Sequence, residues 1–483
     1  MKHLVPRILI TLLFLSSLTP VSGQDLRYIE YDTDLIPPSV HKDRREKIME
    51  QIGPRAVAFF YSAPERNRNA DVEFQYRQDD NLLYLTGFPE PQAILALVPG
   101  GVTVRNPDDT TATMTVKEIL FVRSRNPLRE TWDGRRYGPA GAMKLRGMAY
   151  AVSIEEFAGM LPRITGRGGL DAVYVPPFHS DLSGDIAEAL QPLRAMIDRS
   201  QRRHSTVEFR DPNPMVFRMR AIKSPEEIAL LAKATRISAL AHNQAMMSCE
   251  PGMYEYELQA VYEYVFRKLG AEYGGYPCIV GAAENSVVLH YSGVRKKIRN
   301  GDIVLADCAA EYRGYSSDIT RTFPANGKFS PAQRRIYEIV LAAQNEAIVM
   351  MKPGVEWRAV AVKVEEVIED GLFRLGLVKE KNRREFRKFY LHGIGHPVGL
   401  NVHDISLPVL EPGMVYTIEP GIYVAEGIEG VPAEYTNIGV RIEDVVLITK
   451  EGNSILSSDS PREIAAIEAL MKKKGVGNFP IAD

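Results

Sequence analysis

Two aspartates in the C-terminal half are the first residues whose surroundings suggest chemistry. Asp307 ends an apolar run that begins at Ile303, and Asp318 precedes a run rich in β-branched residues that ends at Phe323. A turn containing Gly314 separates the runs, so the pattern predicts a hairpin. A hairpin would bring together two carboxylates that are eleven positions apart, which is unfavourable unless a cation or proton compensates their charges. Alone, such a pair is more often explained by capped turns and solvated faces.

Clustered histidines strengthen the chemical interpretation. The chain has nine histidines, and His392, His396 and His403 lie within twelve residues. Glycines lie on both sides of His396, at 393, 395 and 399, and let the backbone approach another group closely. The glycine spacing is not the dinucleotide-binding fingerprint, because no strand-to-helix unit surrounds it.

Two glutamates interrupt apolar strands further along. Glu419 ends the run that starts at Met414, and Glu443 lies within the strand-like stretch 439–448. Two-residue alternation places Arg441 and Glu443 on one face of that stretch. Buried carboxylates without partners are costly, so these strands indicate bound cations.

Four carboxylates and one imidazole fit a pair of divalent metal ions. Oxygen-rich ligation favours Mn²⁺, and Fe²⁺, Co²⁺ or Zn²⁺ are compatible with the same ligands. Two ions about 3.5–4 Å apart can activate water and polarise a carbonyl. A neighbouring glutamate can then carry the proton. The residues alone therefore suggest metal-assisted hydrolysis.

In their order, these residues resemble the metallopeptidase family that includes aminopeptidase P, prolidase and methionine aminopeptidase. The resemblance implies a pita-bread catalytic domain. It rests on Asp307, Asp318-Ile-Thr-Arg-Thr-Phe, His290 in Val288-Leu-His-Tyr291, His392-Gly-Ile-Gly-His396, Val402-His403-Asp404, Glu419-Pro-Gly and Arg441-Ile-Glu443-Asp444.

The resemblance also implies a role for each position. Asp318 and Glu443 would bridge two metal ions, and the remaining ligands would be Asp307, His396 and Glu419. Glu419 would also shuttle the proton. The substrate or tetrahedral intermediate would be held by His290, His392 and His403. Arg441 would orient a carboxylate through its planar guanidinium.

Two positions depart from the family pattern. The family commonly has Asp-Ala-Gly at the first ligand and Asp before Val-His, where this chain has Cys308 after Asp307 and Asn401 before Val402. Neither change removes a ligand. Cys308 could itself bind metal, but strand alternation turns it away from Asp307, which favours a small core residue.

The N-terminal half extends the resemblance. The segment 76–90, Tyr-Arg-Gln-Asp-Asp-Asn-Leu-Leu-Tyr-Leu-Thr-Gly-Phe-Pro-Glu, is similar to the N-terminal domain of aminopeptidase P, which methionine aminopeptidase lacks. The expected fold is α/β (α+β), with a creatinase-like N-terminal domain at 24–210, a linker at 211–222 and a pita-bread domain at 223–483. Together the matches span roughly residues 30 to 470.

Local patterns indicate the elements that position the motifs. Apolar runs at 56–61 and 93–98 predict strands, and 100–101 and 106–109 predict turns. Residues 211–214 contain two prolines and predict a break. Ser-Pro pairs at Ser224, Ser330 and Ser460 predict helix starts. The stretches 275–325 and 390–450 read as β-rich, and the charged run 379–388 reads as a solvated helix rather than a nucleic-acid patch.

Composition excludes several classes of protein. The chain has 483 residues, 45% of them apolar, with 59 Lys and Arg against 61 Asp and Glu. This balance gives no global attraction to nucleic acid, and it excludes intrinsic disorder and a polytopic membrane protein. Three cysteines cannot form a disulfide framework.

Residues 1–23 read as a secretory signal peptide. Lys2 and Arg7 precede a short apolar run, and small residues end at Gly23. The run is shorter than the ~20 apolar residues of a spanning helix. A short buried helix or an uncleaved anchor is the alternative. The mature protein is expected to be exported, to the periplasm or the extracellular medium, without a membrane span.

The resemblance implies an Xaa-Pro aminopeptidase, which removes the first residue of peptides whose second residue is proline. An Xaa-Pro dipeptidase (prolidase) uses the same chemistry and stays open. A non-catalytic binding module or metal-free hydrolysis is disfavoured because every ligand position is filled. Since some relatives are tetramers, a dimer or tetramer is expected. Trp132 could reach a neighbour's cleft, although a local core role is equally compatible.

Overall fold

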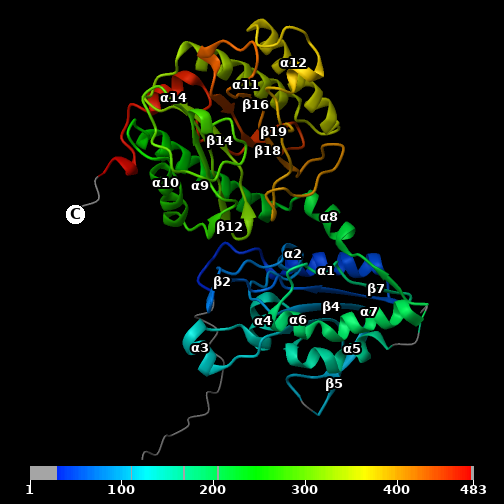
Figure 1. Ribbon diagram of the computed structural model, residues 1–483. Coiled ribbons are helices and arrows are strands. Elements are labelled where there is room, and N and C mark those ends of the chain that lie inside the picture. The colour runs from blue at the N-terminus through cyan, green and yellow to red at the C-terminus, as the bar shows by residue number, and fades with distance from the viewer. Residues whose placement is uncertain (1–29, 110, 167–168, 204–205, 480–483) are drawn as a thin grey trace, which may run out of the picture.

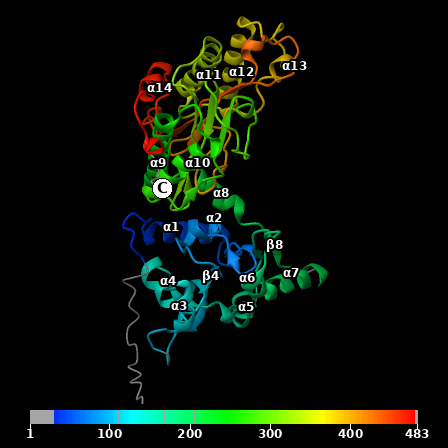
Figure 2. The same ribbon diagram turned by 60° about the vertical axis from the view of Figure 1, so that its left-hand side comes forward.

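The computed structural model describes residues 30–109, 111–166, 169–203 and 206–479 (Figure 1). The predicted signal peptide, 1–23, lies outside these residues. Within the described part of the chain, no helix is both long enough and apolar enough to cross a bilayer. The chain forms two units that meet along the face carrying α1, α2 and α8 (Figures 1 and 2).

The N-terminal unit is a mixed sheet with helices on both faces. Its strands are β1 (Ala56–Tyr61), β2 (Asn67–Asn69), β3 (Val72–Glu73), β4 (Ile94–Arg105), β5 (Thr113–Val122), β6 (Ala151–Ser153), β7 (Ala172–Tyr174) and β8 (Glu208–Arg210). Its helices are α1 (Pro38–Ile52), α2 (Asp80–Thr86), α3 (Pro127–Asp133), α4 (Gly138–Arg146), α5 (Phe157–Thr165), α6 (Gly184–Ala189) and α7 (Gln191–Arg203).

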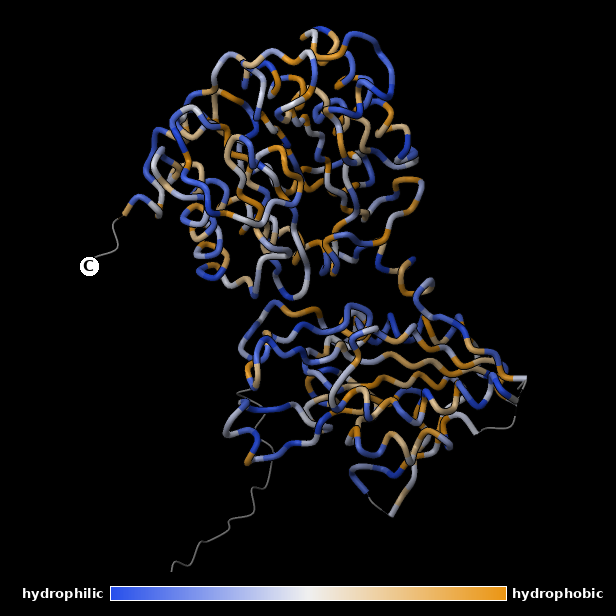
Figure 3. The backbone as a smooth tube through the Cα atoms, in the orientation of Figure 1, coloured by the Kyte–Doolittle hydropathy of each residue, from blue (hydrophilic) through white to orange (hydrophobic). Residues whose placement is uncertain are grey.

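Six of these strands form one sheet in the order β6-β5-β4-β1-β7-β8. Strand alternation sends Phe59 into a core covered by α5, α6 and α7, and Phe60 into a second core beneath α1, α2 and α4. Figure 3 shows the apolar residues following these strands through the interior. The strand predicted at 56–61 is confirmed as β1, and the one predicted at 93–98 begins β4.

The C-terminal unit combines long helices with short sheets. Its helices are α8 (Asn213–Ala221), α9 (Pro225–Ser248), α10 (Glu255–Lys268), α11 (Pro331–Met350), α12 (Trp357–Arg374), α13 (Arg383–Phe386) and α14 (Ile464–Leu470). Its strands are β9 (Tyr273–Gly274), β10 (Ile279–Ala282), β11 (Ile303–Asp307), β12 (Ala310–Tyr312), β13 (Tyr315–Ser316), β14 (Thr320–Pro324), β15 (Val415–Ile418), β16 (Gly421–Val424), β17 (Ile438–Arg441), β18 (Asp444–Ile448) and β19 (Asn453–Ile455).

The sheets of this unit meet where the functional motifs lie. β11 is the centre of a β10-β11-β14 sheet, and β17 pairs with β16. Thr322 Oγ1 on β14 donates to the Arg441 carbonyl on β17 at 2.8 Å, and the Glu443 N–H donates to the Thr320 carbonyl at 3.1 Å. These bonds join the strand pair that carries the aspartates to the strand that precedes Glu443.

Buried charges and apolar packing join the two units. Arg44 of α1 lies 2.8 Å from Glu227 of α9, and their side chains are 5% and 3% exposed. One apolar cluster runs from Leu82 and Leu85 of α2 to Leu231 of α9 and onward through the C-terminal unit. The units therefore share a continuous core.

Several local expectations need correction. The predicted turn at 100–101 is a register shift inside the continuous strand β4, where Gly101 adopts a φ of 74°. Residues 211–212 separate β8 from α8, as predicted, but the break does not extend to 213–214. Helix α8 starts at Asn213, because proline is tolerated in a first helical turn. The boundaries of the domains stay predictions.

Helix starts were predicted with mixed success. Capping boxes at Ser224 and Ser330 start α9 and α11, as predicted. The third start is wrong, since α14 begins only at Ile464. The Ser460 carbonyl instead accepts a hydrogen bond from the buried Arg321 at 2.9 Å, so tertiary contacts override the local signal. In the charged run 379–388, only four residues (α13) are helical.

Candidate active site

Asp307 and Asp318 lie at the ends of two paired strands. β11 pairs antiparallel with β14, and Asp307 is opposite Thr320. Asp318 stands two residues before β14. The predicted hairpin is confirmed, although its connection is longer than a turn because it forms the small hairpin β12–β13. Both aspartates are buried.

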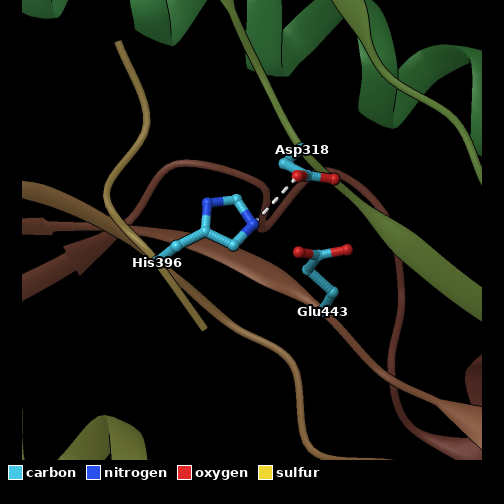
Figure 4. A group of neighbouring side chains, drawn as sticks. All are labelled: Asp318, His396 and Glu443. Atoms are coloured by element: carbon cyan, nitrogen blue, oxygen red, sulfur yellow. Dashed lines mark ion pairs between the residues drawn. The ribbon is translucent and has the colours of Figure 1, made fainter. Parts of the chain in front are cut away.

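His396, Glu419 and Glu443 reach the same place from other elements. Asp318, His396 and Glu443 each offer a ligand atom, and these three atoms all lie within 4.8 Å of one another (Figure 4). His396 Nε2 is 3.4 Å from Asp318 Oδ2 and 3.5 Å from Glu419 Oε1. Glu419 directly follows β15. Strand ends thus converge to form a candidate metal centre.

The centre lies in a cavity of about 500 Å³. All eight residues singled out from the sequence line this cavity: His290, Asp307, Asp318, His392, His396, His403, Glu419 and Glu443. The fold therefore brings these eight residues together, although they are spread over more than 150 positions of the chain. Cys308 is fully buried next to the Ile279 carbonyl, and its thiol belongs to the core.

Arg441 bridges the carboxylates and an aromatic ring. Its Nη2 donates to Asp307 Oδ2 at 2.7 Å, and its Nε donates to Thr320 Oγ1 at 3.1 Å. Its Nη1 donates to the Tyr423 hydroxyl at 2.8 Å. The guanidinium therefore fixes the orientation of Asp307, as the resemblance implies.

The carboxylates of the centre are short of positive charge. Burial and the neighbouring Asp307 raise the pKa of Asp318 well above its ordinary value. Burial and Asp318 do the same for the pKa of Glu443. Burial and Glu443 raise the pKa of Glu419 to about 8. The single positive charge of Arg441 does not balance the negative charges of these carboxylates. The carboxylate oxygens therefore fit divalent cations as ligands.

Two tyrosines of the site were missed by the sequence analysis. The Tyr276 hydroxyl donates to the carboxylates of both Asp307 and Asp318. The Tyr423 hydroxyl lies 2.7 Å from His392 Nε2. Tyr276 lies outside the motifs described above, between β9 and β10. The alternation of β16 could have marked Tyr423, but only its pairing with β17 places that ring beside Arg441.

His242 binds the backbone next to both aspartates of the site. Its Nε2 lies 3.0 Å from the Cys308 carbonyl and 2.9 Å from the Ile319 carbonyl, the residues that follow the two aspartates. Because carbonyls only accept, Nε2 carries the proton, and Nδ1 accepts from the Tyr262 hydroxyl at 3.0 Å. Burial lowers the pKa of His242 to about 3, so the ring is neutral in the folded protein.

We expect His242 to make the protein acid-sensitive. Below pH 6.5 the unfolded chain protonates this histidine but the folded chain does not, so the free energy of unfolding falls as the pH falls. The full contribution is present above pH 6.5. A His242→Gln variant should lose a slope approaching about 1.4 kcal/mol per pH unit below that point. Urea unfolding of both proteins at several pH values between 4.5 and 7 measures the difference, and parallel profiles would contradict it.

Comparisons with known proteins agree with this geometry. Residues 229–450 match metallopeptidase family M24, and residues 41–174 match the aminopeptidase P N-terminal domain. The chain is 40% identical over 442 residues to Escherichia coli Xaa-Pro aminopeptidase, covering 89% of this chain and 96% of that protein.

Solved structures match over the same length. An aminopeptidase of Pseudomonas aeruginosa superposes with a TM-score of 0.82 at 39% identity, over 91% of this chain and 99% of that one. A zinc-substituted aminopeptidase P of E. coli in complex with product gives 0.81 at 38% identity, over 90% and 98%.

Fold and site together define a metallopeptidase. More narrowly, the chain belongs to the aminopeptidase P group of metallopeptidase family M24. The expected fold, a creatinase-like N-terminal domain followed by a pita-bread domain, is confirmed.

Proposed function

We propose that this chain hydrolyses the N-terminal Xaa-Pro bond of peptides and releases the first amino acid. One observation carries the proposal. Four carboxylates and His396 converge in a cavity that His290, His392 and His403 also line. The scaffold matches a solved aminopeptidase over 91% of this chain. A bond to proline lacks an N–H and has a fixed ring, which gives a dedicated peptidase a distinct substrate.

We propose that the centre holds two divalent ions, with Mn²⁺ as the preferred metal. The ions would be held by Asp307, Asp318, His396, Glu419 and Glu443, and Asp318 and Glu443 would be shared between them. The oxygen-rich donors and their excess negative charge support this assignment. Bound ions would supply the positive charge that polarises a carbonyl and lowers the pKa of water.

The protein's own groups would handle the proton and the substrate. Glu419 takes the proton of the attacking water and delivers it to the proline nitrogen as the bond breaks. His392 Nδ1 lies 3.8 Å from Glu419 Oε2. Burial and Arg441 lower the pKa of His392 to about 4, so this imidazole stays neutral. His290 and His403 line the same cavity and would hold the substrate or the tetrahedral intermediate.

Substrate length separates the aminopeptidase from the dipeptidase. We expect metal-stripped protein reloaded with Mn²⁺ to cleave an Xaa-Pro-Yaa tripeptide and to leave both an Xaa-Pro dipeptide and an Xaa-Ala-Yaa tripeptide nearly intact. Product amines measured over time decide the outcome. Preferred cleavage of the dipeptide would make the protein a prolidase. No turnover with Mn²⁺, Co²⁺, Fe²⁺ or Zn²⁺ would favour a peptidase-like binding module.

Export and assembly are further proposals. We propose that residues 1–23 direct export to the periplasm or extracellular medium, which N-terminal sequencing of exported protein would test.

We also propose that the protein assembles as a dimer or tetramer. Trp132 is 87% exposed and Leu128 81% exposed on α3, so the local core role for Trp132 is wrong and both side chains are available to a second copy.

A further inference from the structure

A buried cluster of charges connects the two domains outside the active-site cavity. Arg220 of α8 is 4% exposed, and its guanidinium donates to Asn81 Oδ1 and to Asp404 Oδ1, both at 2.8 Å. Lys223 Nζ lies 3.5 Å from the other Asp404 oxygen. Asp80 Oδ2 is 3.3 Å from Arg220 Nη2. We call these five residues the Arg220 cluster.

The turn 397–404 is built around the Asp404 carboxylate. The Asp404 N–H donates to the Pro397 carbonyl at 2.9 Å, which closes the turn. A Cβ on Gly399 would lie 2.0 Å from Asp404 Oδ2, so the carboxylate fills the space that a side chain would need. The His403 N–H donates to Asn401 Oδ1 at 3.0 Å.

This turn sets the distance between two histidines of the site. His396 directly precedes it, and His403 lies next to Asp404. The two rings meet edge to face, with centroids 4.3 Å apart and an angle of 85° between their planes. A shift of Asp404 would therefore move His403 relative to His396.

The N-terminal domain reaches the same turn through a motif that the site does not explain. Arg77 and Asp80 belong to the segment 76–90 and pair at 2.7 Å. Arg77 also donates to the Leu400 carbonyl, inside the turn, and to Glu311 at 2.7 Å. Residues of the first domain thus contact the turn both directly and through Arg220.

We propose that the Arg220 cluster is a positioning device for His403. Asp404, held between Arg220 and Lys223, fixes the turn so that His403 faces the substrate beside His396, and Asp80 and Asn81 bring the N-terminal domain into this arrangement. A planar guanidinium with buried partners allows little freedom in their relative positions. The proposal rests on the proposed function, because His403 acts on substrate only there.

A double-mutant cycle tests whether Asp404 acts through His403. We expect Asp404→Asn to lower kcat/KM for the Xaa-Pro-Yaa tripeptide by about 10- to 100-fold, as is typical when the partner of a site residue is removed. When His403 is already replaced by alanine, adding Asp404→Asn should lower kcat/KM by less than about twofold. Losses that multiply instead would overturn the proposal.

Two further variants guard against a general loss of stability. Asp404→Asn removes the anion beside the buried Lys223 and one of the two carboxylates beside Arg220. Asn81→Ala therefore serves as a milder change in the other domain. It should show a smaller loss with the same non-additivity. Asp34→Asn is the matched control, because Asp34 pairs with Lys233 across the domains at 2.6 Å without being part of the cluster. Its kcat/KM should stay within about twofold of the parent value.

Hydrogen exchange gives a readout that needs no turnover. In Arg220→Met we expect the backbone amides of residues 398–404 to exchange at least about tenfold faster, while Asp34→Asn leaves them unchanged. Unchanged exchange in Arg220→Met would overturn the proposal. If the parent protein cleaves no Xaa-Pro peptide but exchange behaves as expected, the proposed function fails and the positioning of the turn stands.

Discussion

Replacing Glu419 by glutamine is expected to lower kcat for an Xaa-Pro-Yaa tripeptide by about 10²- to 10⁴-fold, the usual contribution of a positioned acid–base group. A carboxamide keeps the size of the side chain but cannot carry the proton from water to the leaving nitrogen. Burial and Glu443 raise the pKa of Glu419 to about 8, which shows how unfavourable its uncompensated negative charge is in this site.

Steady-state kinetics at saturating Mn²⁺ measure this effect, with metal content determined on the same samples. Glu426→Gln is the matched control, since Glu426 is exposed on the loop after β16. It should retain its activity. Near-normal turnover in Glu419→Gln would remove Glu419 from the proton transfer and with it much of the proposed mechanism.

Replacing Asp318 by asparagine is expected to have two opposite effects. Turnover should fall by at least about 10³-fold, because a proposed metal ligand is lost and metal catalysis contributes several kcal/mol. The metal-free variant, however, should be more stable than the metal-free parent. Burial and the nearby Asp307 disfavour the charged form of Asp318, and asparagine removes that charge.

Calorimetry with and without Mn²⁺ separates the two effects. Metal at 100 times its dissociation constant should stabilise the parent by about 2.7 kcal/mol and the variant by much less. Asp108→Asn, in an exposed loop, should change neither quantity. If the metal-free variant is less stable than the metal-free parent, burial and the charge of Asp307 do not destabilise the protein through Asp318.

The candidate site could be predicted from sequence because its carboxylate ligands lie in or beside recognisable strands and its histidine ligand lies in a glycine-rich motif. Asp307 and Glu419 follow apolar runs, and His396 is set off by glycines, so short patterns located them. Tyr276 and Tyr423 were missed because their partners are far away in the sequence. Tertiary contacts bring Tyr276 to Asp307 and Asp318, and they bring Tyr423 to His392 and Arg441. The same holds for Arg220, which meets Asn81 across 139 positions.

Parts of the fold were mispredicted where tertiary contacts outweighed local signals. The glycine pair that contains Gly101 reads as a turn, but β4 pairs with β5 on both sides of it, at 94–97 and at 102–105, so the strand continues through it. Ser460 reads as a helix cap, but its carbonyl is held by Arg321, itself paired with the buried Asp444 at 2.8 Å. Local propensity determines the secondary structure of a segment only where such tertiary contacts are weak.

The core shared by the two domains has a consequence for how the protein denatures. Leu82 and Leu85 of α2 belong to the same apolar cluster as Leu231 of α9, so melting either domain would expose the apolar surface of the other to water. The described chain should therefore unfold as one cooperative unit, and a fragment ending near residue 210 should aggregate rather than fold by itself. The N-terminal domain is in this sense a structural half of the peptidase and not a detachable accessory.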